Sequence, residues 1–284
     1  MRSYRPYAVA IAVSLVAGAC ALARVGSVEP DLPPGGTGWR LAFTDDFDGV
    51  ALDGSKWTTC YWWADGGCTN GSSGEVQWYM PGRVSVTGGS LRLEAGEQAA
   101  LTPNGDTYEF TSGMVSTGPS TDEPQDRPRF AFQYGFVEMR ARVPAGQGLW
   151  SAFWLLPTSL ESRPEIDVAE VLGHEPQRGY AYVHLADDGH KIDDGDDWVT
   201  DDMSVGWHRF GLWWTPETLT WYVDDVASWR YTDAARTPSE PMYVLANLAV
   251  GGEWAGPPDA TTRFPSTLEI DHVRVWQQRS DGGE

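Results

Sequence analysis

The stretch Pro164-Glu165-Ile166-Asp167-Val168-Ala169-Glu170-Val171-Leu172-Gly173 sets three carboxylates among apolar, β-prone residues. A buried strand normally excludes Asp and Glu, because an unpartnered carboxylate is costly to desolvate. On a strand, Glu165 and Asp167 point to one face, while Ile166 and Val168 point to the other. Glu170 is out of phase and joins the first face only if a β-bulge adds one residue. The stretch therefore indicates either paired glutamates suited to acid–base and nucleophilic chemistry, or an edge strand with a solvated acidic face.

Short alternating segments on both sides of this stretch predict a fold made of strands. Residues 134–143 alternate apolar and polar side chains, and residues 148–157 are more continuously apolar. Further strands are expected at residues 39–43, 84–86, 90–94, 108–116, 180–184, 207–214, 218–223, 242–248 and 268–276. Residues 193–202 are interpreted as a solvated acidic loop. Strands at this spacing, with turn signals between them, predict an all-β sandwich or jelly roll in one domain, residues 37–278.

The N-terminal residues have the features of an export signal. A positively charged start precedes a short apolar run at residues 8–16, and small residues lead to Cys20. The apolar run is too short to predict a membrane span. Cys20 is either lipidated, as in a bacterial lipoprotein, or lies beside a plain cleavage site. We expect residues 1–20 to be the signal, 21–36 a flexible linker and 279–284 a disordered tail. The protein is then secreted or lipid-anchored at the bacterial cell surface.

The charge and the cysteines restrict partners and compartment. The formal net charge is −20 with only two lysines, which argues against nucleic acids and anionic membranes as partners. A neutral polysaccharide would not be repelled by this negative charge. We expect the protein to be a monomer. If Cys20 belongs to the signal, Cys60 and Cys68 remain as a pair across a short glycine-containing loop. This spacing makes a local disulfide plausible in an oxidising compartment.

Seven segments, taken together and in order, resemble glycoside hydrolase family 16, the laminarinase-like group. They are residues 43–49, 74–79, 134–142, 148–157, 165–173, 247–254 and 270–276. The resemblance implies a concanavalin A-like jelly roll of two antiparallel sheets, with an open cleft on the concave face. It also implies an exported retaining endo-β-glycanase for a neutral polysaccharide, first of all β-1,3-glucan, without a catalytic cofactor. A β-galactan or agar-type enzyme of the same family is one alternative, and a non-catalytic lectin-like sandwich is another.

The resemblance also assigns the three carboxylates. It makes Glu165 the nucleophile, Asp167 the assisting residue and Glu170 the general acid/base. The spacing, with Ala169 as the extra residue, resembles the bulged laminarinase, agarase and carrageenase branch rather than the mixed-linkage glucanases. A retaining mechanism needs two carboxyl groups about 5–5.5 Å apart. Asp167 should add negative charge that keeps Glu170 protonated near neutral pH.

Six further residues are expected to bind substrate: Trp150, Trp154, His184, Trp254, Glu75 and Arg140. Trp150 and Trp154 are four apart on a strand and share a face, where sugar rings could stack on them. For both, burial in a core is the competing interpretation. His184 corresponds to a family histidine near the cleaved bond, and the competing interpretation is a histidine buried in the core. Trp254 either stacks on a sugar or packs against other side chains of the protein.

A structural calcium ion is the one metal that the resemblance suggests. Asp271 and backbone oxygens near Asp46 and Gly89 would supply the oxygen ligands that calcium prefers. The alternative is that Asp271 is simply an acidic residue on the last strand.

Overall fold

The structure is a computed structural model that describes residues 32–63, 68–120 and 127–279. Contacts divide the chain into Met1–Leu32 and Pro33–Glu284, and the fold below belongs to the second unit. The predicted signal with Cys20, and residues 21–31 of the predicted linker, lie outside the described residues, as do residues 280–284 of the tail. Pro33 accepts a backbone hydrogen bond from Gly36, and Arg279 donates one to Gly38. Arg279 therefore belongs to the fold rather than to the predicted tail.

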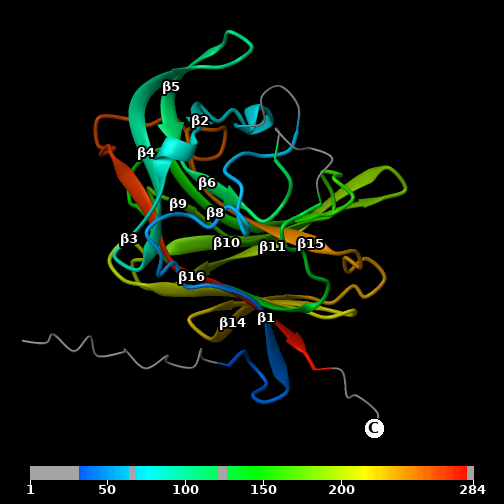
Figure 1. Ribbon diagram of the computed structural model, residues 1–284. Coiled ribbons are helices and arrows are strands. Elements are labelled where there is room, and N and C mark those ends of the chain that lie inside the picture. The colour runs from blue at the N-terminus through cyan, green and yellow to red at the C-terminus, as the bar shows by residue number, and fades with distance from the viewer. Residues whose placement is uncertain (1–31, 64–67, 121–126, 280–284) are drawn as a thin grey trace, which may run out of the picture. The chain divides into compact units, whose positions relative to one another are not determined.

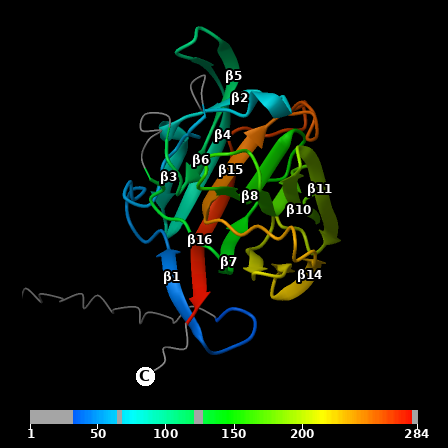
Figure 2. The same cartoon turned by 90° about the vertical axis from the view of Figure 1, so that its right-hand side faces the viewer.

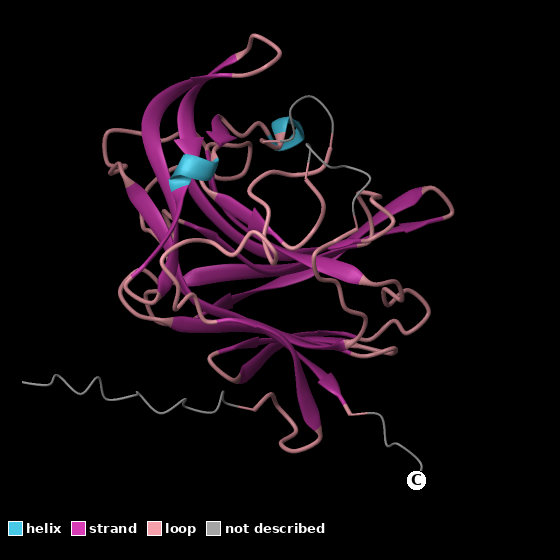
Figure 3. Cartoon of the chain, viewed as in Figure 1, coloured by secondary structure: helices cyan, strands magenta, loops and turns pink. Residues whose placement is uncertain are grey.

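The described elements are strands and two short 3₁₀ helices (Figure 3). They are β1 (Trp39–Asp45), η1 (Gly71–Ser73), β2 (Gln77–Tyr79), η2 (Pro81–Arg83), β3 (Val84–Thr87), β4 (Ser90–Leu101), β5 (Thr107–Ser112), β6 (Met114–Ser116), β7 (Gly135–Arg142), β8 (Leu149–Pro157), β9 (Glu165–Leu172), β10 (Arg178–Asp187), β11 (His190–Val199), β12 (His208–Trp214), β13 (Leu219–Val223), β14 (Val226–Tyr231), β15 (Met242–Val250) and β16 (Ser266–Gln278). No helix among the described residues has the length and hydropathy to cross a membrane.

The strands form two sheets that pack face to face (Figures 1 and 2). The six-stranded sheet has the order β11-β10-β9-β8-β15-β6. The ten-stranded sheet has the order β14-β13-β12-β7-β16-β4-β5-β2, with β1 added to β16 and β3 to β4. Strand β2 pairs with β5 in parallel, and the other pairings are antiparallel. The predicted all-β jelly-roll sandwich is confirmed, with that one parallel pairing as a departure from purely antiparallel sheets.

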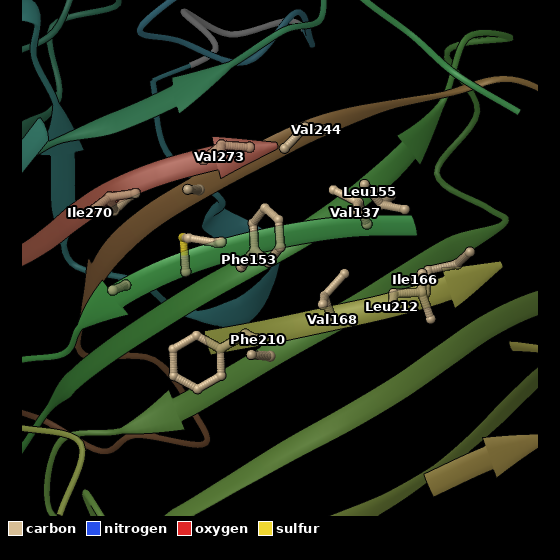
Figure 4. Close-up of a cluster of buried hydrophobic side chains, with 14 of the residues drawn as sticks. Val137, Phe153, Leu155, Ile166, Val168, Phe210, Leu212, Val244, Ile270 and Val273 are labelled. Atoms are coloured by element: carbon tan, nitrogen blue, oxygen red, sulfur yellow. The ribbon is translucent and has the colours of Figure 1, made fainter. Parts of the chain in front are cut away.

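Every second side chain along these strands points into the space between the two sheets. Figure 4 shows Ile166 and Val168 of β9 and Phe153 of β8 in the same cluster as Val137 and Leu212 of the other sheet. All five are buried. Burial of such a side chain contributes about 1.5–3 kcal/mol. This core fixes which face of β8, β9 and β10 points away from the other sheet, and that outward side is called the outer face below.

Three sequence predictions about strands are wrong. Residues 193–199 of the predicted acidic loop belong to strand β11, which pairs with β10 over its whole length from Arg178↔Val199 to Asp187↔His190. Strands β2 and β14 have no counterpart among the predicted strands, and residues 226–230 show weak hydrophobic alternation. The single strand expected at residues 108–116 is two strands in different sheets, separated at Gly113. A Cβ at Gly113 would lie 2.5 Å from the carbonyl oxygen of Arg83, so the crossover requires glycine there.

Candidate active site

A β-bulge in β9 places all three carboxylates on the outer face. Against β8, Asp167 is opposite Trp154 and Ala169 is opposite Phe153, so Val168 has no partner. Val168 and Ala169 both turn inward and are buried in the core. Glu170 therefore returns to the face of Glu165 and Asp167, which confirms the predicted bulge. One detail differs, because the residue without a partner on β8 is Val168 rather than Ala169.

The carboxylate row (Glu165, Asp167 and Glu170) lies beside an imidazole. His184 of β10 is directly opposite Glu165 in the strand pairing, and its Nε2 lies 3.0 Å from Oδ2 of Asp167. One carboxylate oxygen of Glu165, one of Asp167 and one ring nitrogen of His184 all lie within 4.8 Å of one another. No other three His, Cys, Asp or Glu side chains among the described residues come together in this way. Asp167 is almost fully buried at 3 % exposure, so the ion pair with His184 compensates a charge that water cannot solvate. His184 is thereby placed in the site rather than in the core.

Burial and mutual repulsion raise the pKa values of both glutamates. The pKa of Glu170 is raised well above 4.5, first by burial and then by the charges of Asp167 and Glu165. The pKa of Glu165 is also raised by burial and by Asp167, but His184 and Arg163 oppose that shift. Burial lowers the pKa of His184, but its pairing with Asp167 and Asp193 outweighs this and raises it to about 10. The pKa values of both glutamates are thus raised, that of Glu165 to about 8, and the neighbouring His184 cation is the group that most opposes the shift at Glu165.

Aromatic side chains border the carboxylate row on the side of Glu170. Trp150 donates its indole N–H to Oε1 of Glu170 at 3.1 Å. Its ring lies 5.4 Å from that of Trp254, which is 37 % exposed and also contacts Tyr180 at 4.7 Å. Tyr180 and Tyr182 are opposite Glu170 and Asp167 on β10, and were not predicted as site residues. Their signal in the sequence was the alternation in residues 180–184, which places both tyrosines on the face of His184.

A pocket of about 670 Å³ adjoins the carboxylate row at the other end, beside Glu165. Its lining includes Trp154, and Trp62 and Trp63 from the loop that the Cys60–Cys68 disulfide closes. The predicted disulfide is present. Trp154 is buried, with 7 % exposure, but it borders this pocket and so combines packing with a place in the site. Aromatic rings thus lie on both sides of the carboxylates.

Glu75 begins a buried hydrogen-bond network next to the site. It is 8 % exposed, and its carboxylate accepts hydrogen bonds from Ser73 at 2.9 Å and from the Tyr79 hydroxyl at 3.3 Å. Asn247 then donates to the Tyr79 oxygen at 3.0 Å and accepts from the Trp154 indole at 2.8 Å. That Glu75 also binds substrate stays a prediction, since Glu170 of the carboxylate row is equally buried. The Glu75 carboxylate begins a buried network that fixes the orientation of Trp154.

Arg140 is the clearest error among the predicted substrate-binding residues. It lies on β7 of the ten-stranded sheet between the buried Met139 and Ala141, so it points away from the core on the opposite side from the carboxylates. There its Nη1 lies 3.0 Å from Oδ2 of Asp271, and its guanidinium group lies over Trp207. Sequence alternation shows that a side chain points outward but not from which sheet.

The same contacts bear on the predicted calcium site. Oδ2 of Asp271 already lies near Arg140 and accepts from Nδ1 of His272 at 2.9 Å. The carboxylate of Asp46 accepts from Arg274 at 2.6 Å, and Gly89 lies in the turn between β3 and β4. A cation bound by the Asp271 side chain would compete with the Arg140 guanidinium group, whereas the predicted ligands near Asp46 and Gly89 are backbone oxygens. The calcium ion, with ligands from Asp271, Asp46 and Gly89, stays a prediction.

The chain is similar to known glycoside hydrolases in sequence and in fold. The model of the family described as glycosyl hydrolases family 16 matches residues 82–269. The endo-1,3-1,4-β-glycanase EglC of Rhizobium meliloti is 37% identical over 256 residues, which cover 84% of this chain and 52% of that protein. The β-glucanase of Rhodothermus marinus is 30% identical, with 89% of both chains covered. The endo-β-1,3-glucanase structure from Pyrococcus furiosus superposes with a TM-score of 0.75 at 30% identity, covering 85% of this chain and 95% of that one.

The lengths of the relatives differ. The chain spans about half the length of EglC and of a second R. meliloti relative, ExsH, at 52% of each.

Proposed function

Because the chain belongs to glycosyl hydrolase family 16, we propose that it is a retaining endo-β-glucanase that hydrolyses β-1,3-linked glucan. The observation that carries the proposal is the bulge of β9, which brings Glu165, Asp167 and Glu170 onto one face between two groups of aromatic side chains. A lectin-like sandwich would need the aromatic side chains but not the buried carboxylates, whose desolvation costs stability.

The proposed reaction has two steps. In the first, an oxygen of Glu165 attacks the anomeric carbon while Glu170 gives its proton to the departing glycosidic oxygen, which leaves a glycosyl ester on Glu165. In the second, Glu170 takes a proton from water as the water oxygen attacks the same carbon, and Glu165 leaves as a carboxylate. The raised pKa of Glu170 suits the first step, and the His184 cation beside Asp167 suits the release of an ionised Glu165.

The choice of linkage rests on names of relatives and on charge. A neutral glucan does not have to overcome the net charge of −20. Two relatives are named for β-1,3-glucan or for β-glucan generally, whereas EglC is named for 1,3-1,4 linkages, so a mixed-linkage glucan is the second candidate. A β-galactan is the third. Export, with or without a lipid on Cys20, is proposed from the sequence signal only.

The test compares Glu165→Gln with Glu161→Gln on laminarin, lichenan and agarose. Glu161 lines the same pocket but is exposed and lies outside the carboxylate row, so it controls for a lost charge. We expect wild type and Glu161→Gln to release reducing ends from laminarin, and Glu165→Gln to be slower by about 10⁴-fold or more. Proton NMR of the first products should show the β-anomer. An initial α-anomer, or persistent binding of laminarin without new reducing ends, would refute the proposal.

A further inference from the structure

A second row of polar contacts leads from His184 away from the carboxylates and onto the edge strand β11. Asp193 is directly opposite His184 in the β10–β11 pairing, and its Oδ1 lies 2.7 Å from Nδ1 of the imidazole. Since Nε2 faces Asp167, both ring nitrogens of His184 have a carboxylate partner. An imidazole with a carboxylate at each nitrogen is held as the imidazolium, and its ring cannot rotate without breaking a charged contact.

Arg163 holds Asp193 in place. Its Nη1 donates to the same Oδ1 of Asp193 at 2.7 Å and also approaches the carbonyl oxygens of Leu185 at 3.1 Å and Ile192 at 3.3 Å. The guanidinium group therefore ties the start of β9 to the ends of β10 and β11. Its side chain is 18 % exposed, against 52 % for Asp193, so the more buried group anchors the more exposed one.

We infer that Asp193, anchored by Arg163, is a positioning residue that fixes the His184 ring against Asp167 and so sets the geometry of the carboxylate row. The inference rests on the proposed glycanase function. Asp193 makes no described hydrogen bond to Glu165 or Glu170. It contacts the site through His184, and its charge adds a smaller direct effect that raises the pKa of Glu165. The contacts also distinguish it from its acidic neighbours on β11: Asp194 is exposed and lies opposite Val183, on the other face of the strand.

The charges around His184 predict what a lost Asp193 does. The titratable and charged groups that face the ring are Glu165, Asp167 and Glu170 of β9, Arg163 before β9, Tyr182 on β10 itself, and Asp193 of β11. Asp167 still faces Nε2 of the ring when Asp193 is removed, so His184 keeps one carboxylate partner. The ring then keeps its charge but loses one of its two anchors, and a catalytic group displaced by a fraction of an ångström loses rate.

The test is Asp193→Ala with Asp194→Ala as the matched control. We expect kcat on laminarin to fall about tenfold in Asp193→Ala with KM within about twofold, because no substrate contact is removed. Asp193→Asn, which keeps a neutral acceptor for the imidazole N–H, should recover part of the loss. Asp194→Ala removes the same charge from the same strand and should behave as wild type.

A second measurement needs no substrate. Titration of the His184 ring by NMR should show its midpoint about 1 pH unit lower in Asp193→Ala and unchanged in Asp194→Ala. The ring loses one charged partner in Asp193→Ala, and the shift is modest because that partner is half exposed to solvent. Unchanged kcat and an unchanged His184 midpoint in folded Asp193→Ala would overturn the inference. An inactive wild type would instead overturn the proposed function, and the NMR titration would still decide whether Asp193 holds His184.

Discussion

Deletion of Val168 tests the strand register on which the site depends. In the bulge, Val168 and Ala169 together occupy the space of one residue, since Asp167 and Ala169 are opposite consecutive residues of β8. Removing Val168 therefore makes the pairing regular without moving any later residue to the other face. Glu170 should stay opposite Ala152, on the face of Asp167.

The expected cost has two parts. Val168 is 2 % exposed, so its loss removes one buried aliphatic side chain and costs about 1–3 kcal/mol of stability. The bulge also adds local twist, and straightening it should shift the Glu170 carboxyl group by about 1 Å, which corresponds to about a hundredfold loss of kcat/KM. We expect a folded enzyme of lower melting temperature with weak but measurable activity on laminarin.

Deletion of Ile166 is the matched control. It removes a buried aliphatic residue from the same strand, two positions away and outside the bulge. Here the alternation has no spare residue, so Glu165 and Asp167 are forced to opposite faces and one carboxylate must enter the core. This variant should be inactive and poorly folded. The register argument is refuted if the Val168 deletion is folded by circular dichroism yet as inactive as the Ile166 deletion.

Two further predictions concern stability. Because the pKa of Glu170 is raised in the folded protein, its neutral form is favoured there, and stability is lost as pH rises from the unfolded value near 4.5 through the folded one. Glu170→Gln should thus be more stable than wild type by about 1–2 kcal/mol at pH 8 in urea unfolding, and the difference should vanish near pH 4. A difference in unfolding free energy that becomes smaller as the pH rises would contradict this. Replacing both Cys60 and Cys68 with serine should lower the free energy of unfolding by about 2–3 kcal/mol, as expected for a short closed loop; an unchanged urea midpoint would contradict this. The same variant should have a raised KM, because Trp62 and Trp63 lose their fixed place in the pocket.

The predictions that succeeded depend on local periodicity. Alternation by two along residues 165–170 fixes which side chains share a face, and Glu170 can join the face of Glu165 and Asp167 only through a bulge. The predictions that failed depend on which strands are neighbours. The segment of Arg140 resembles the family and so predicts a substrate contact, whereas the pairing of β7 with β12 and β16 is a long-range outcome that puts Arg140 on the other sheet.

Strand β11 shows the same limit and explains an unusual run of acidic residues. Asp193, Asp194, Asp196 and Asp197 show no hydrophobic alternation and so indicate a loop, yet they form the edge of the six-stranded sheet. Charged side chains on an edge strand oppose pairing with another chain. An acidic residue at any of these positions would protect the edge in this way. Of these four carboxylates, only that of Asp193 forms hydrogen bonds with both Arg163 and His184. The acidic edge thus serves two needs at once, and only a substitution at position 193 should affect both.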